Sequence, residues 1–148
     1  MDEPSLGVLV FIAGRAMESR VLEAIHAAGH TDITLAQARV AARIGPHGTR
    51  LTDLAQQAQI AKQTATALVD RLERGGYVER VVDPADGRSR LVRIADRGRE
   101  LLPIARAEEA KVEAEWASHL GERRMRQLRE ALTMLREICD PYAADGPP

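Results

Sequence analysis

Polar residues near the start of a predicted helix over residues 62–74 have the types and spacing needed to hydrogen-bond to DNA base edges. The apolar side chains of this segment recur at i, i+3, i+4 and i+7, so they form one buried face. The opposite face carries Lys62, Gln63, Thr64, Thr66, Ala67, Asp70 and Arg71. The candidate DNA-binding residues among them are Lys62, Gln63, Thr64, Thr66 and Arg71. In the major groove, Gln can pair with adenine, Thr can contact a thymine methyl and Lys can reach guanine or phosphate. The alternative is that these side chains only cover a solvated helix face.

A second group of candidate residues lies at the tip of the one predicted β-hairpin. The segments 77–82 and 90–94 are rich in β-branched residues, and the turn-forming residues 83–87 separate them. Arg88 and Arg90 follow that turn. A small basic tip can enter the minor groove of DNA, where the negative potential attracts arginine. Alone, a charged hairpin tip would be only a solvated loop, so its meaning depends on the helices before it.

No pattern in the sequence indicates an enzyme, a cofactor site or a metal site. The motifs of serine hydrolases, zinc proteases and nucleotide-binding loops are absent, and no pair of carboxylates stands out. His26 and His30 are four residues apart, but Gly29 is expected to end their helix between them. Cys139 has an apolar position in the last predicted helix beside Asp140, which disfavours a reactive thiolate.

The candidate residues need a series of helices to position them. Apolar periodicity and turn residues predict helices over 6–28, 34–44, 51–58, 62–74, 96–118 and 122–139. Thr34 and Gln37 form a capping box, whereas Thr52 and Asp96 are expected near the N-caps of later helices. Pro103 is expected to bend or break the fifth helix. The third and fourth helices, with the tight turn between them, have the dimensions of a helix-turn-helix.

Composition and charge predict a soluble protein whose contact with any polyanion is local. The chain has 148 residues, of which 45% are hydrophobic and 29% charged. Its longest apolar run is far shorter than the roughly 18 residues of a membrane span, and residues 1–5 lack the positive charge of a secretory signal. We therefore expect a cytoplasmic protein without membrane contact. The net charge is −1, yet residues 51–99 carry +2.

Two stretches of the sequence resemble the MarR family of winged helix-turn-helix transcriptional regulators. They are Leu51-Thr52-Asp53-Leu54-Ala55 and the segment 64–98, with Val69-Asp70-Arg71-Leu72-Glu73-Arg74 and Asp83-Pro84-Ala85-Asp86-Gly87-Arg88 as its most specific parts. The implied fold is mainly α with a small β-hairpin wing. It comprises a DNA-binding lobe over 34–99, dimerisation helices over 5–30 and 100–140, and a loose tail over 141–148.

The resemblance also implies partners and residue roles. A homodimer with intertwined terminal helices would bind a pseudo-palindromic DNA duplex, with recognition helices about 34 Å apart. The helix residues would lie in the major groove and Arg88 in the minor groove, while Asp86 would brace the wing by pairing with an arginine, for which Arg90 is the candidate. Trp116 would support the dimer interface. The regulator would most simply be a repressor that a small ligand, such as an aromatic compound, releases from DNA.

Three positions depart from the family pattern. Ala67 replaces a frequent arginine, and Ala61 and Ala95 replace residues that often cap helices.

Two other functions stay open. The first alternative is a winged-helix protein that uses its hairpin for protein contacts and never binds DNA. The second is a small helical enzyme, which requires a deep cleft lined by perturbed titratable groups.

Overall fold

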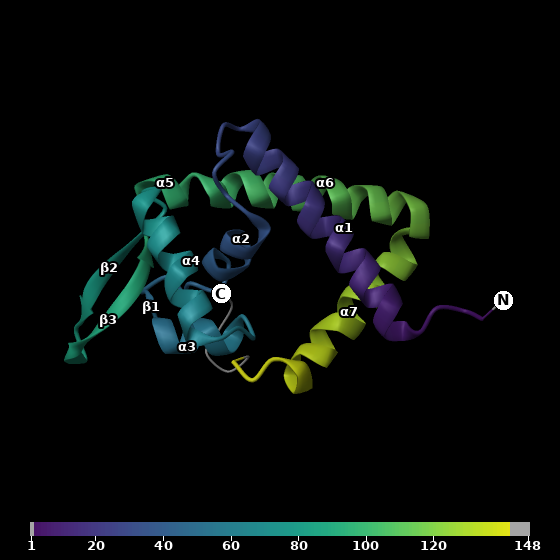
Figure 1. The fold of residues 1–148 in the computed structure, drawn as a ribbon. Helices are drawn as coiled ribbons and strands as arrows, with labels where there is room; N and C mark the ends of the chain where they lie inside the picture. Colours follow the sequence, from purple (N-terminus) through teal and green to yellow (C-terminus); the bar gives the residue numbers. More distant parts are fainter. Residues whose placement is uncertain (1, 143–148) are drawn as a thin grey trace.

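The chain folds into a small lobe of helices and strands attached to an arm of longer helices (Figure 1). The structure, a computed structural model, describes residues 2–142. In chain order the elements are α1 (Leu6–Ala27), α2 (Leu35–Ala41), β1 (Thr49–Arg50), α3 (Leu51–Gln57), α4 (Lys62–Arg74), β2 (Val78–Asp83), β3 (Asp86–Ile94), α5 (Asp96–Arg99), α6 (Leu101–Leu120) and α7 (Glu122–Cys139). The predicted fold class, mainly α with a small β-wing, is confirmed.

The lobe contains the hydrophobic core and a three-stranded antiparallel sheet. The strand order is β1-β3-β2, in which β2 and β3 form the predicted hairpin and β1 adds two residues to the other edge of β3. The core is built from side chains of α2, α3, α4, the hairpin and the segments between them: Ile33, Val40, Ile44, Leu54, Leu68, Val69, Leu72, Tyr77, Val78 and Val92. Ile25 of α1 joins the same cluster, so the end of α1 packs on the lobe.

Tyr77 connects four parts of the lobe. Its ring is 2% exposed, and its hydroxyl donates a hydrogen bond of 2.6 Å to Asp32 in the loop before α2. Since that hydrogen is taken, Nδ1 of His30, 3.1 Å away, must donate its own hydrogen to the same oxygen. Arg97 of α5 lies 4.4 Å from the ring centre and also donates to Asp32. Burial and the Asp32 contact raise the pKa of Tyr77, so the phenol stays protonated.

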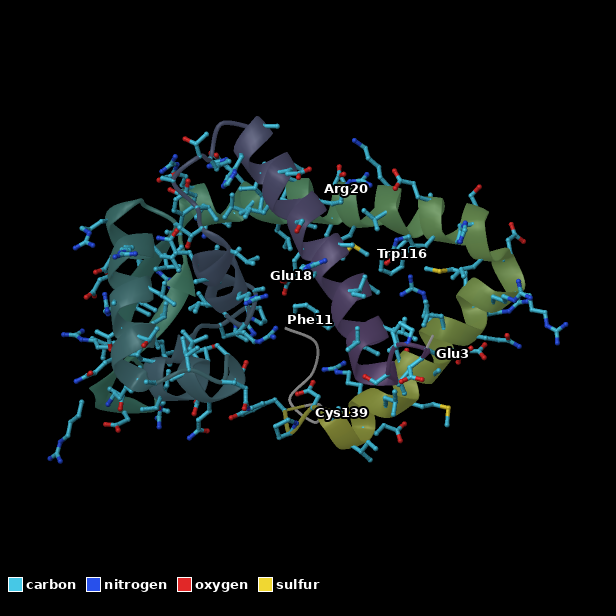
Figure 2. All side chains as sticks on the ribbon, turned by 45° about the vertical axis from the view of Figure 1, so that its right-hand side comes forward. Glu3, Phe11, Glu18, Arg20, Trp116 and Cys139 are labelled. Atoms are coloured by element: carbon cyan, nitrogen blue, oxygen red, sulfur yellow. The ribbon has the colours of Figure 1, made fainter. Side chains whose placement is uncertain are left out.

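The arm consists of α1, α6 and α7. Helix α1 crosses α6, and Arg20 fixes the crossing with hydrogen bonds of 2.9 Å to Glu108 and 2.7 Å to Glu115 (Figure 2). Helix α7 follows α6 after Gly121, whose φ of +86° suits glycine. None of the 18 residues of α7 is buried, and the first two turns of α1 are exposed as well.

Several predicted helix ends differ from the structure. Helix α2 ends at Ala41 rather than Ile44, because a tight turn follows in which Ile44 N–H donates to Ala41. Thr52 and Asp96 are not N-caps: Arg50 and Ala95 have those positions, without a side-chain hydrogen bond. The Thr34–Gln37 capping box is present, with bonds of 2.7 and 3.2 Å.

The long helix predicted over 96–118 is broken, as Pro103 suggested. Helix α5 has four residues, and α6 begins at Leu101 and extends to Leu120. Pro103 is the third residue of α6, a position where its missing N–H costs little. Of the predicted tail 141–148, residues 143–148 lie outside the described part. No helix between residues 2 and 142 is long and apolar enough to cross a membrane.

The close approach of α5 to Tyr77, the residue before β2, generates a stability prediction. A Cβ at Gly98 would lie 2.1 Å from the carbonyl oxygen of Tyr77, which accepts a hydrogen bond from Ala95. Gly98→Ala should therefore lower the free energy of unfolding by about 1–3 kcal/mol. The measurement is urea unfolding at one fixed protein concentration. Gly87→Ala is the control, because no atom lies within 4 Å of its added Cβ. Equal stability of the two variants would contradict the prediction.

Candidate nucleic-acid interface

Helix α4 presents a buried face to the core and a polar face to solvent. Ala65, Leu68, Val69 and Leu72 are buried, as their periodicity predicted. Lys62, Gln63 and Thr64 are exposed in the first turn. The N-cap residue, Ala61, makes no side-chain hydrogen bond, so burial of the apolar face holds the helix start in place.

The remaining helix residues of the predicted site are also accessible. Thr66 is half-buried, and its hydroxyl donates a bond of 2.9 Å to the Lys62 carbonyl, which leaves the oxygen able to accept. Arg71 is exposed two turns after the helix start. Five of the seven predicted contact residues thus share one accessible helix surface.

The other two predicted residues, Arg88 and Arg90, are exposed on β3 near the tip of the hairpin. The hairpin extends away from the helices of the lobe (Figure 1). Within residues 2–142, no hydrogen bond or ion pair joins these two side chains to α4. The helix surface and the arginine tip are therefore two separate contact surfaces on one lobe.

An ion pair between β1 and the last residue of β2 was not predicted. Arg50, at the end of β1, donates hydrogen bonds of 3.0 and 2.8 Å to one oxygen of Asp83, which is 6% exposed. The other oxygen of Asp83 accepts from the Ala85 N–H at 2.9 Å. The Ala85 bond and then the Arg50 guanidinium lower the pKa of Asp83, and the same pair raises the pKa of Arg50. No local sequence signal could identify partners 33 residues apart.

The structure corrects the predicted partner of Asp86. No ion pair between Asp86 and Arg90 occurs in the described residues, and Asp86 instead accepts bonds of 3.0 Å from the Arg88 N–H and the Ser89 hydroxyl. It therefore stabilises the turn at the tip through local bonds. The arginine–carboxylate pair that fixes the wing is formed by Arg50 and Asp83.

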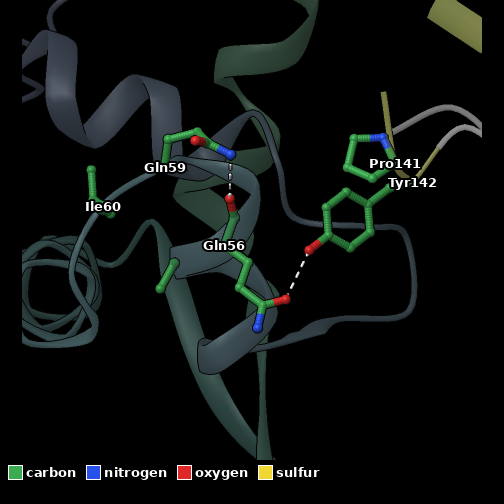
Figure 3. A pocket seen from close by; sticks show the side chains of 6 residues that line it. Gln56, Gln59, Ile60, Pro141 and Tyr142 are labelled. Carbon is green, nitrogen blue, oxygen red and sulfur yellow. Dashed lines mark hydrogen bonds between the residues drawn. The ribbon is translucent and has the colours of Figure 1, made fainter. Parts of the chain in front are cut away.

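An open hollow of about 370 Å³ lies beside the turn between α3 and α4 (Figure 3). Two glutamine amides, the Tyr142 phenol and apolar side chains line it: Ala55, Gln56, Gln59, Ile60, Pro141 and Tyr142. The Tyr142 hydroxyl donates a bond of 2.9 Å to Gln56. The lining holds no pair of acid and base groups, so it lacks the features expected of an enzyme cleft.

His26, His30 and Cys139 are further side chains that could bind a metal ion or react as a thiol. His26 Nε2 donates a bond of 2.6 Å to the Ile33 carbonyl, and His30 is bonded to Tyr77. Among residues 2–142, no three His, Cys, Asp or Glu side chains are close enough to bind a metal ion. Cys139 is a free thiol on the exposed surface of α7.

The sequence of the chain is similar to known transcriptional regulators. A family model described as the MarR family matches residues 31–89. The transcriptional activatory protein BadR of Rhodopseudomonas palustris is 32% identical over 94 residues, which are 64% of this chain and 53% of BadR. The chain spans about half the length of the curated relatives it matches.

The fold is similar to those of solved MarR-family proteins. A crystal structure of MarR has a TM-score of 0.74 and 26% identity, with coverage of 90% of this chain and 96% of that one. The transcriptional repressor CouR, bound to a 23-mer DNA duplex, has a TM-score of 0.67 and 25% identity, with coverage of 88% and 92%. These proteins share the winged helix-turn-helix arrangement found here.

The ion pair of Arg50 and Asp83 generates a pH prediction. Because the folded-state pKa of Asp83 lies below its ordinary 3.8, the carboxylate stabilises the fold above about pH 4, and this contribution is lost as pH falls through the lowered pKa. Asp83→Asn should therefore be less stable than the unaltered protein at pH 7, and the difference should shrink towards pH 3. Urea unfolding at both pH values measures it.

Asp86→Asn is the matched control for this experiment, because Asp86 is an exposed carboxylate of the same hairpin. It should lower stability less than Asp83→Asn at pH 7. A difference for Asp83→Asn that is the same at pH 7 and pH 3 would show that the charge of Asp83 does not stabilise the fold.

Proposed function

Because the chain belongs to the MarR family of winged helix-turn-helix proteins, a family of regulators rather than enzymes, we propose that it is a cytoplasmic, homodimeric transcriptional regulator that binds a specific DNA duplex. The observation that carries the proposal is the polar, accessible surface at the start of α4 on a helix whose opposite face is fully anchored in the core. An α-helix with that arrangement fits the major groove, where side chains can reach base edges.

The proposed contacts divide between base recognition and phosphate binding. Gln63 and Thr64, in the first turn of α4, have the hydrogen-bonding groups for base edges, and Lys62 can reach guanine or a phosphate. Thr66 and Arg71 would extend this surface along the helix. Arg88 and Arg90 at the wing tip would enter or border the minor groove. CouR, the neighbour bound to DNA, supports this assignment through its shared fold.

The proposed dimer would use the apolar surfaces at the two ends of the chain. Phe11 of α1 is 60% exposed and Ile138 of α7 is 84% exposed, with other large apolar side chains around them: Leu6, Leu9, Val10, Leu132, Met134 and Leu135. This many exposed large apolar side chains on two helices are unfavourable in water and typical of an interface. A two-fold partner would cover both helices and set the spacing of the two α4 helices to one turn of DNA.

For the mode of regulation, we propose repression relieved by a small ligand such as an aromatic acid. The physical mechanism would be a shift towards dimers whose α4 spacing does not fit DNA. The curated relative BadR is an activatory protein and CouR is a repressor, so either direction occurs among similar proteins. Release of bound DNA by members of an aromatic-acid series, in the assay below, would support this part.

The competing function is a winged-helix module that binds another protein through its hairpin. The exposed Val82, at 50%, is the observation that favours it, because an apolar side chain on a wing suits a protein contact. Salt dependence separates the two functions. Contacts with phosphates release counterions, so DNA affinity falls steeply as salt rises.

The test of DNA binding is a mobility-shift assay with the DNA that flanks the chain's own coding region, at two salt concentrations. Arg88→Ala and Thr64→Ala should each weaken specific binding by about 1–3 kcal/mol, or roughly tenfold and more. Arg106→Ala and Thr31→Ala are matched controls on exposed positions outside the proposed surface. Binding that is insensitive to salt and to all four substitutions would overturn the proposal.

The dimer makes a separate prediction. Phe11→Asp and Ile138→Asp should each weaken self-association at least roughly tenfold, because each places a charge in a buried apolar contact. Sedimentation at a series of protein concentrations measures the effect. Val82→Asp, an equivalent change at an exposed apolar residue of the wing, should leave self-association unchanged. A monomeric unaltered protein at high concentration would refute the dimer.

A further inference from the structure

Helix α4 carries two carboxylates on or beside the surface proposed to face DNA. Asp70 lies four residues after Thr66 and seven after Gln63, so it continues the same stripe of the helix. Glu73 lies one turn further, and both side chains are partly exposed, at 46% and 42%. An unpaired carboxylate here would repel the phosphates that Lys62 and Arg71 would bind.

Arg80, in β2, is bound to both carboxylates. Its Nη2 donates a hydrogen bond of 2.7 Å to Asp70, and its Nη1 donates one of 2.8 Å to Glu73. The backbone N–H of Arg80 also donates to the other oxygen of Glu73 at 3.2 Å. One guanidinium therefore holds two carboxylates from successive turns of α4 in a geometry that a lysine cannot reproduce.

The position of Arg80 makes these bonds rigid. Its side chain is 25% exposed, which is less than either carboxylate, so solvent screens the interaction only in part. Its backbone is fixed by the pairing of Arg80 with Val92 in the hairpin. The neighbouring pair of Glu79 and Arg93 satisfies the other charges on this part of the hairpin.

We propose that Arg80 is a positioning residue for DNA recognition, which acts by neutralising Asp70 and Glu73 so that α4 can approach the phosphate backbone. This inference rests on the proposed function. The guanidinium of Arg80 is directed at α4, to which two of its five N–H groups donate, so its proposed role requires no contact with DNA. Its loss would leave two negative charges on the recognition helix without a counter-charge.

The test compares DNA affinity in a charge series built on the full chain. Arg80→Ala should weaken binding roughly tenfold at low salt, and less at high salt, because salt screens the exposed carboxylates. Adding Asp70→Asn to Arg80→Ala restores the original net charge of the cluster and should recover most of the affinity. Asp70→Asn alone should bind at least as tightly as the unaltered protein.

Two further variants keep the test decisive. Arg93→Ala also removes one arginine from the hairpin, but its partner is Glu79 and not a residue of α4, so it should weaken binding less than Arg80→Ala. Arg80→Gln keeps an amide donor without the charge, and it repeats the series if the alanine variant does not fold. Thermal unfolding of each variant separates loss of affinity from loss of structure.

The outcomes distinguish this inference from the proposed function. If the unaltered protein binds DNA but Arg80→Ala and Arg80→Gln behave like Arg93→Ala, or if Asp70→Asn fails to restore binding, the role of Arg80 is overturned and the proposed function stands. If the unaltered protein binds no DNA, the proposed function fails and this inference fails with it. Rescue by Asp70→Asn supports the inference, because a purely structural loss would not be restored.

Discussion

The buried hydroxyl of Tyr77 is the interaction on which the arrangement of the lobe depends. It holds the loop before α2 through Asp32, the end of α1 through His30 and, with Arg97, the start of α5. The backbone carbonyl of Tyr77 approaches Gly98 so closely that a side chain at Gly98 would force α5 away from Tyr77. The end of α4, the start of the wing and the beginning of the arm therefore meet at one residue, and the relative placement of the contact surfaces follows from it.

The candidate interface is held by apolar burial and, in addition, by paired charges. The apolar face of α4 fixes the helix on the core, and Arg80 joins its second half to β2. Arg50 joins β1 to the end of β2 in the wing through Asp83. Each arginine combines a hydrogen-bond network with a compensating charge, which leaves the start of α4 and the wing tip accessible to a polyanion.

Periodicity in the sequence was sufficient to predict α1, α4 and α7 to within one residue, because one apolar face determines each helix. Strand β1 could not be predicted, since two residues carry no pattern and the pairing with β3 lies more than 40 residues away. The partner of Asp83 could not be predicted for the same reason, because Arg50 lies 33 residues away. The partner predicted for Asp86 was wrong for a different reason: its carboxylate accepts from groups two and three residues away instead of pairing with Arg90. Local sequence patterns predict helices, whereas ion pairs between residues far apart in the sequence are found only from the folded structure.

The absence of buried side chains on α7 has a consequence for regulation. In the proposed homodimer, α7 would gain its packing from the second copy, so the population of dimers would rise with the square of monomer abundance when abundance is low. Occupancy of a promoter would then respond sigmoidally to the cellular dose of this protein, even before any small molecule is considered.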